Sequence, residues 1–415
     1  MTARSADVRE RARAALRSSV EARSDELVAL RRHLHAHPEP SGEEHDTTLL
    51  LVERLQAADL SPVVLASGTG LICDVGPGDA PPTVAIRGDI DALRMTDDKD
   101  VPYRSRRDGV AHACGHDVHT VVTLGAGLAL DELLRGHDPD RSDDRPSLPT
   151  GRVRLIFEPS EERVPGGAVE VVESGALDGI RSVFGLHCDP KLDAGVLGVR
   201  SGPLTYAADL VEIHLHGPGG HTARPHLTVD LVDVAARVVR ELPARVAAAA
   251  GESELLLTFG AIVAGDAPNV IPTRAELRGS LRTPDRDLWF RGEDIVREAL
   301  GAIVEDTGAD WDLLQRRGVP PVVNRPHETS LLADAGTAVL GPDGVVTTPR
   351  SVGGDSFSWY LERTGGSYGR LGTHPPSLPE RLDLHAGTFD VDESVIALGA
   401  QILACAALSA LDDPA

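Results

Sequence analysis

The sequence predicts an α/β fold: a larger domain built on a mostly parallel sheet flanked by helices, with an inserted ferredoxin-like α+β satellite domain. Short apolar, β-branched runs at 83–93, 153–159 and 182–188 alternate with helical patterns, which is typical of βαβ units. Residues 205–316 follow a different order, β-α-β-β-α-β, which is that of a ferredoxin-like unit. The length of 415 residues suits two domains.

Helical and loop signals connect the strands of the first half. Residues 1–19 alternate charge with alanine and predict a solvated helix. Ser41 and Glu44 have capping-box spacing ahead of an apolar helical stripe. The periodicity over 119–134 predicts a buried helix, and the polar, Pro-containing stretch 135–151 predicts a surface loop.

The second pattern predicts the inserted domain and its limits. Its expected strands are 205–216, 254–264, 270–282 and 311–316, and its expected helices are 228–249 and 285–307. The Pro-containing stretch 318–324 resembles a hinge, after which helix and strand patterns alternate again to the end. We therefore expect the larger domain, the candidate catalytic domain of the clusters described below, in two parts, 1–201 and 318–415, with the satellite domain at 202–317.

Charge and cysteine usage limit the partners and the compartment. The net charge of −23 argues against nucleic acid or an anionic membrane as the main partner. We expect no membrane-spanning run, and the N-terminus lacks the apolar centre of a signal peptide. Four widely spaced cysteines favour buried thiols or metal ligands over a disulfide framework. A cytoplasmic location is therefore expected.

Four clusters carry residues suited to chemistry: the segment 112–119 with Cys114 and His116, the pair Glu161 and Glu162, His187, and His385. Each is weak alone, because a lone histidine at a strand end is more often a core residue and adjacent glutamates are usually surface charge. Together they suffice for two divalent ions and leave one glutamate as a base. The second and third clusters should converge outside the carboxyl ends of parallel strands.

The sequence resembles the aminoacylase/carboxypeptidase family of dinuclear metallohydrolases. It is similar to the amidohydrolase branch, which includes hippurate hydrolases, N-acyl-amino-acid amidohydrolases and indole-acetyl-amino-acid hydrolases. The segments that carry the resemblance are RRHLHAHPEPSGEE (31–44), IRGDIDAL (86–93), HACGHDVHT (112–120), EPSEE (158–162), GLH (185–187), GGHTARPH (219–226), NVIPT (269–273) and LHAGTFDVDE (384–393). They follow the family's order over nearly the whole chain.

The resemblance implies a role for each matching residue. The implied metal ligands are Cys114, which would bridge two ions, and His116, Glu162, His187 and His385. Glu161 matches the general base, while His221 and Asn269 match satellite-domain residues that polarise the substrate carbonyl when the domains close. Arg282 is placed to bind a carboxylate, and Asp89, Asp91, Asp117 and His119 match residues that orient ligands and fix tautomers.

The implied activity is metal-dependent hydrolysis of N-acyl amino acids or related small amides. A thiolate ligand favours zinc, cobalt or nickel over magnesium or calcium, and manganese remains open. The satellite domain implies a homodimer. Three alternatives stay open: a dipeptidase or carboxypeptidase with the same ions, a catalytically silent small-molecule binder, and a role of Cys114 as a redox-sensing thiol. The chain has Gly-Gly-Asp-Ser-Phe at 353–357 where the branch usually has Glu-Asp-Phe, which puts the substrate pocket in doubt.

Overall fold

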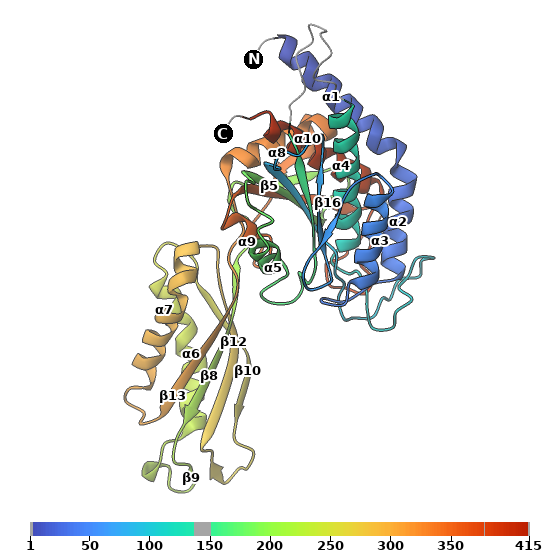
Figure 1. The fold of residues 1–415 in the computed structure, drawn as a ribbon. Helices are drawn as coiled ribbons and strands as arrows, with labels where there is room; N and C mark the ends of the chain where they lie inside the picture. Colours follow the sequence, from blue (N-terminus) through green and yellow to red (C-terminus); the bar gives the residue numbers. More distant parts are fainter. Residues whose placement is uncertain (1–2, 137–150, 377, 414–415) are drawn as a thin grey trace. The chain divides into compact units, whose positions relative to one another are not determined.

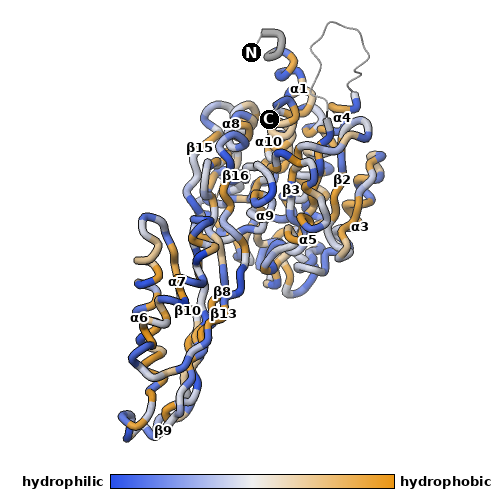
Figure 2. Tube along the Cα trace, turned by 60° about the vertical axis from the view of Figure 1, so that its left-hand side comes forward, coloured by the Kyte–Doolittle hydropathy of each residue, from blue (hydrophilic) through white to orange (hydrophobic). Residues whose placement is uncertain are grey.

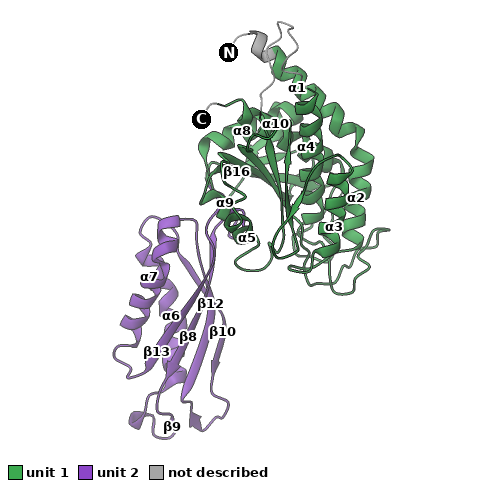
Figure 3. Cartoon of the chain, viewed as in Figure 1, with its two compact units in different colours: residues 1–202, 323–349, 359–415 green, residues 203–322, 350–358 purple. Residues whose placement is uncertain are grey.

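A computed structural model describes residues 3–136, 151–376 and 378–413. The chain forms two compact units (Figure 3). Unit 1 contains residues 1–202, 323–349 and 359–415, and unit 2 contains residues 203–322 and 350–358. Two segments expected in the second part of the catalytic domain, 318–322 and 350–358, therefore group with unit 2. Most of the loop expected at 135–151 lies outside the described residues.

Unit 1 is built on an eight-stranded sheet with the strand order β1-β2-β4-β3-β5-β16-β6-β15 (Figure 1). Its strands are β1 (Val63–Val64), β2 (Leu71–Val75), β3 (Val84–Asp89), β4 (Val153–Glu158), β5 (Ser182–Asp193), β6 (Leu197–Val199), β15 (Val345–Thr347) and β16 (Gly365–His374). The central strands β4, β3, β5 and β16 pair in parallel, as predicted. Because β3 lies between β4 and β5, the residues that follow these strands gather at one edge of the sheet.

Helices flank the sheet of unit 1. They are α1 (Ala3–Ala22), α2 (Ser24–Ala36), α3 (His45–Gln56), α4 (His116–Arg135), α5 (Ala168–Glu173), α8 (Pro326–Leu340) and α10 (Ser394–Leu411), and the short helix α9 spans Ser358–Leu361. Helix α4 packs on β3, and α10 packs against α4 and α8. One apolar core joins these helices to both the central strands and the short strand β2.

Two expectations about helices of unit 1 were wrong. Helix α1 is not solvated all round, because Ala12, Leu16 and Val20 bury one of its faces in the core. Helix α10 is long and apolar enough to cross a membrane by length and composition, although no such run was expected. Since 72% of α10 is buried inside the fold, its apolar character is that of a core helix.

The start of α3 also differs from the predicted capping box. The helix begins at His45, and the Ser41 hydroxyl donates a hydrogen bond of 2.6 Å to Asp91 instead of capping the helix. The carboxylate of Glu39 accepts the backbone N–H groups of Asp46 and Thr47 at 3.1 and 2.7 Å. A carboxylate at a helix N-terminus satisfies free N–H groups and favours the helix dipole, so Glu39 replaces the expected cap.

Unit 2 is a four-stranded antiparallel sheet with two helices. Its elements are β8 (Ala207–His216), α6 (Leu231–Ala249), β10 (Leu256–Ala264), β12 (Arg274–Thr283), α7 (Arg286–Val304) and β13 (Asp310–Val319), with the strand order β10-β12-β8-β13. In Figure 2, hydrophobic and hydrophilic segments alternate along α6 and α7, as expected for helices with one buried face. Their apolar faces form a second core with the sheet. Minor pairs join β9 (Gly220–His221) to β11 (Val270–Ile271) and β7 (Gly202–Pro203) to β14 (Val323–Asn324).

A buried ion cluster stabilises the centre of the unit 1 sheet. Arg87 is 1% exposed, pairs with Asp89, and donates from Nε to Glu158 Oε2 at 2.7 Å. Arg87→Met would leave two buried carboxylates without their cation, so we expect it to lower the free energy of unfolding by roughly 3–5 kcal/mol. Urea denaturation measures this effect. The exposed Arg104→Met is the control and should change stability by less than about 0.5 kcal/mol.

Candidate metal centre

The segment Cys114-Gly115-His116 forms the tight turn that starts α4. Gly115 precedes the helix with φ of +87°, a left-handed conformation that glycine adopts without strain. A Cβ at this position would lie 2.7 Å from Cys188 Sγ. The turn therefore needs glycine for both its dihedral angle and its close approach to β5, and it places Cys114 and His116 on the same side.

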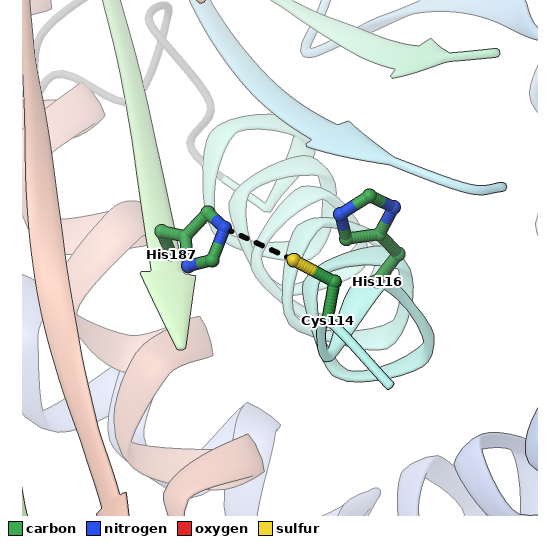
Figure 4. Close-up of side chains that lie close together, drawn as sticks. All are labelled: Cys114, His116 and His187. Atoms are coloured by element: carbon green, nitrogen blue, oxygen red, sulfur yellow. Dashed lines mark hydrogen bonds between the residues drawn. The ribbon is translucent and has the colours of Figure 1, made fainter. Parts of the chain in front are cut away.

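His187 projects toward this turn from within β5. The strand continues to Asp193, so the expectation that it ends at His187 was wrong. Nδ1 of His187 lies 2.7 Å from the Cys188 carbonyl, to which it donates, and Nε2 lies 3.6 Å from Cys114 Sγ (Figure 4). Burial, followed by the charge of Arg370, holds the pKa of His187 well below its usual value. The ring is a neutral imidazole that presents Nε2 to the cluster, as a metal ligand requires.

His116, Glu162 and His385 complete the cluster. Nδ1 of His116 lies 3.0 Å from the backbone carbonyl of Asp91 and 3.1 Å from its carboxylate. Nε2 of His116 and Oε1 of Glu162 are 3.9 Å apart, and the buried Nε2 of His116 has no hydrogen-bond partner among the described residues. His385 approaches the same Glu162 oxygen with Nε2 at 3.1 Å.

The structure brings the five predicted ligands and the predicted base into one cluster. The predicted ligands and base fall in three groups whose ligand atoms lie within 4.8 Å of one another: Cys114, His116 and His187; Cys114, Glu162 and His385; and His116, Glu161 and Glu162. Cys114, His116 and Glu162 each belong to two of these three groups. A further group, formed by Asp89, His116 and His119, also contains His116. Buried donor atoms without partners are costly unless an ion or water satisfies them, and sulfur, imidazole and carboxylate are a suitable donor set for transition metals. The residues therefore fit a metal centre, and their individual roles stay predictions.

The protonation of two candidate ligands depends on the cluster. Burial, followed by the charge of Glu162, raises the pKa of Cys114 well above its usual value. Burial lowers the pKa of His116, but the charge of Asp89 and the hydrogen bond to Asp91 more than offset this effect and hold it well above the usual value. In the absence of metal both groups therefore retain protons at neutral pH. Metal binding must displace these protons, so the affinity should rise with pH.

The four predicted orienting residues contact the cluster or its supports. Asp91 binds His116 and also accepts the backbone N–H of Glu162 at 3.0 Å, which ties two predicted ligands to one carboxylate. His119 accepts the N–H of Cys188 on Nε2 at 2.8 Å and donates from Nδ1 to Asp89 at 2.6 Å. Because both of its nitrogens are engaged, His119 orients β5 and is not a ligand in this geometry.

Asp117 is held by Arg31, for which the sequence predicted no individual role. Arg31 is fully buried, and its Nε lies 2.8 Å from Asp117 Oδ2, while Nδ1 of His35 lies 2.7 Å from the same oxygen. Burial raises the pKa of Asp117, but Arg31 and His35 hold it well below its usual value. This ion cluster fixes the first turn of α4, next to His116. No local pattern marks Arg31, because its partners are distant in sequence.

A second unpredicted support is Glu44, which holds the turn before the two glutamates. Ser160 adopts a left-handed φ of +56° and donates its backbone N–H to Glu44 Oε1 at 2.7 Å. Burial and the charge of Asp91 raise the pKa of Glu44. His385 is also left-handed, with φ of +59°, and its N–H donates to the Ala113 carbonyl at 2.8 Å. Such strained residues persist when their surroundings hold them, and they concentrate at functional sites.

The predicted residues of the satellite domain lie in unit 2. His221 pairs with Val270 in the β9–β11 ribbon, and the carbonyl of Asn269 accepts the N–H of Thr222 at 3.4 Å, so the two lie near each other. Arg282 lies on β12 and donates to the Val352 carbonyl at 2.8 Å. Their roles toward a substrate stay predictions. Asp355 lies in the segment 353–357, which differs from the usual Glu-Asp-Phe of the amidohydrolase branch. Its buried carboxylate accepts the N–H of Phe357 at 2.9 Å and stabilises this segment.

The first histidine of the motif does not join the metal cluster. His112 is 2% exposed, and its two ring nitrogens have no hydrogen-bond partner among the described residues. Burial lowers the pKa of His112 to about 3, so the ring is neutral. Its place in the motif therefore reflects packing beside His35, whose ring centroid lies 6.2 Å away.

We expect Gly115→Ala to disrupt the centre. The methyl group would meet Cys188 at 2.7 Å, and the left-handed φ costs about 1–2 kcal/mol in addition to about 1–3 kcal/mol for overpacking. Equilibrium unfolding and metal content measure the effect. Gly109→Ala is the control, because Gly109 has φ of +72° but no atom within 4 Å of the added carbon. Equal losses for both variants would show that the contact with Cys188 is unimportant.

Comparison with known proteins identifies the family of this chain. A family model described as Peptidase family M20/M25/M40 matches residues 85–409, and the chain belongs to this family of hydrolases. The N-acetyl-L-cysteine deacetylase of Bacillus subtilis is 34% identical over 89% of this chain and 85% of its own length. The Thermostable carboxypeptidase 2 of Saccharolobus solfataricus is 31% identical over 93% of this chain and 95% of its own length.

Two further similarities concern a longer protein and a solved structure. A Rhodococcus jostii protein named "Putative glutamate--cysteine ligase 2-3" is 40% identical over 95% of this chain, but the chain spans only 48% of its length. The crystal structure of the Bacillus subtilis YXEP protein, described as a dinuclear metal binding peptidase from the M20 family, has a TM-score of 0.81 and 29% identity. The match covers 94% of this chain and 99% of that one. A fold and donor set of this kind define a dinuclear metallohydrolase.

Proposed function

We propose that this protein hydrolyses the amide bond of N-acyl amino acids or related small amides. The observation that carries this proposal is the cluster of Cys114, His116, Glu162, His187 and His385, with Glu161 at its edge. The names of relatives that act as a deacetylase or a carboxypeptidase support the same reaction type. The name of the longer ligase relative does not bear on this proposal, because the match covers about half of that protein.

Different residues of the chain have different roles in the proposed amide hydrolysis. When bound, two divalent ions lower the pKa of a water molecule and polarise the scissile carbonyl. Glu161 takes the proton of the attacking water and delivers it to the leaving amine. His221 and Asn269 stabilise the charge that develops on the carbonyl oxygen, a role that contributes a few kcal/mol in comparable sites.

The metal, the assembly and the compartment complete the proposal. The thiolate of Cys114 favours zinc, cobalt or nickel, and the remaining nitrogen and oxygen donors also accept manganese. We infer a homodimer from the resemblance of unit 2 to a dimerisation domain. The net charge of −23 and the four free, buried cysteines support a cytoplasmic protein with neither nucleic acid nor membrane as its partner.

A substrate panel tests the proposed function. Protein loaded separately with zinc, manganese, cobalt or nickel is assayed with N-acetyl and N-benzoyl amino acids and with dipeptides. Release of the free amino acid from the N-acyl compounds is the expected result. Faster cleavage of dipeptides or of longer peptides at their carboxyl end would favour the peptidase alternative. A protein that binds two ions but cleaves none of these compounds would overturn the proposal in favour of a silent binder.

A further inference from the structure

Among the described residues, one buried arginine has no carboxylate partner. Four arginine or lysine residues are buried among the described parts of the chain: Arg31, Arg87, Lys99 and Arg370. The first three each form an ion pair with a buried aspartate: with Asp117 at 2.8 Å, with Asp89, and with Asp97 at 2.9 Å. The side chain of Arg370, which is 9% exposed, has neither an ion pair nor a hydrogen bond within the described residues.

Arg370 lies directly beside the metal cluster. It is on β16, in register with His187 on β5 and with Gly198 on β6. Residues in register on neighbouring strands project to the same face of a sheet, so the guanidinium and the imidazole share one face. The ring of Tyr368 links them, with its centroid 5.8 Å from the Arg370 guanidinium carbon and 6.1 Å from the His187 ring.

The surroundings of Arg370 leave it accessible to a small anion. Arg370 is 9% exposed, so part of the residue keeps contact with solvent. The ring of Tyr368 stabilises the cation only modestly. A largely buried positive charge without an anion is unfavourable, and an anionic ligand would compensate it.

We propose that Arg370 binds a carboxylate group of the substrate beside the metal centre. The planar guanidinium donates two parallel N–H bonds to a carboxylate, which a neutral amide or ester cannot match. This inference rests on the proposed function, because an N-acyl amino acid carries a carboxylate close to its scissile amide. It makes Arg370 a specificity-determining residue on the catalytic unit, separate from Arg282 of unit 2.

Three related substrates distinguish the position of the carboxylate. Hippurate carries it on the amino-acid side, N-succinylglycinamide carries it on the acyl side, and hippuramide has none. Arg370→Met should raise KM at least about tenfold for the carboxylate-bearing substrate that the site accepts, because hydrogen bonds to charged groups contribute about 1.5–3 kcal/mol. It should change kcat by less and leave hippuramide unaffected. Arg370→Lys should restore part of the loss, and the exposed Arg104→Met should have no effect.

The substrate whose KM rises in Arg370→Met shows which carboxylate, that of the amino acid or that of the acyl group, binds Arg370. A higher KM for hippurate places the amino-acid carboxylate on Arg370, and a higher KM for N-succinylglycinamide places the acyl carboxylate there. Equal changes for all three substrates, or no change for either acid, would overturn the proposal.

Thermal unfolding of the metal-free protein separates ligand binding from a structural role. Arg370 has no carboxylate to neutralise in the free protein, so Arg370→Met should unfold at the same or a higher temperature than the wild type. Arg87→Met, which removes a buried cation with two carboxylate partners, should unfold at a lower temperature. A loss of stability in Arg370→Met as large as that in Arg87→Met would assign Arg370 to the structure and overturn its proposed role.

The proposed function and the role of Arg370 can fail independently. If the wild type with zinc, manganese, cobalt or nickel cleaves none of the three compounds, the proposed function fails. Calorimetric titration of hippurate and N-succinylglycinamide into wild-type and Arg370→Met protein then decides on the carboxylate site alone. Binding that disappears in the variant supports the site, whereas equal binding, or none to the wild type, overturns it.

Discussion

Replacing Glu161 by glutamine is expected to lower kcat for amide hydrolysis by about 10²–10⁴ while the protein keeps its metal ions. Glutamine has nearly the same shape as glutamate but cannot accept a proton from water at neutral pH. Glu161 follows the strained Ser160 and lies in one group with His116 and Glu162. Parallel measurements of metal content and initial rate on an N-acyl amino acid test this expectation.

Two other glutamates provide the controls for this variant. Glu162→Gln should lose metal as well as activity, because the Glu162 carboxylate lies in one set of candidate metal ligands with His116 and in another with His385. Glu173→Gln, at the exposed end of α5, should change neither. Full activity of Glu161→Gln with normal metal content would leave the site intact but exclude Glu161 as the base.

Much of the fold could be predicted because its strands carry strong local patterns. The buried runs that became β3, β4 and β5 are short and β-branched, and the satellite elements repeat their apolar positions with clear periods. The start of α3 could not be predicted in the same way. The spacing of Ser41 and Glu44 fits a capping box, but their side chains bind residues that follow the ends of β3 and β4, and Glu39 satisfies the helix instead. Tertiary contacts decide between such local alternatives.

The site, like the fold, could be predicted only where its residues form a local pattern in the sequence. Its candidate ligands were identifiable because Cys114 and His116 are two residues apart and Glu161 and Glu162 are adjacent, each next to a predicted strand. The supports were not, because Arg31 is separated from Asp117 by 86 residues and Arg370 from His187 by 183. An arginine has no local sequence feature that distinguishes a structural ion pair from a binding group. Only the elements packed around each residue show that, among the described residues, Arg31 has carboxylate partners and Arg370 has none.

Replacing Cys114 by serine is expected to weaken metal binding by at least about 100-fold, the upper end of the effect of removing a group that only orients a ligand. The Cys114 sulfur lies in one set of candidate metal ligands with His187 and in another with His385, so its loss affects the whole cluster. Titration with cobalt tests this directly, since a cobalt–thiolate bond gives a charge-transfer absorption that an alcohol ligand does not. The wild type should show this band, and Cys114→Ser should lack it and lose activity. Cys405→Ser, which changes a buried thiol in α10 outside these groups, is the control and should keep the band. A wild-type cobalt protein without the band would exclude the thiolate as a ligand.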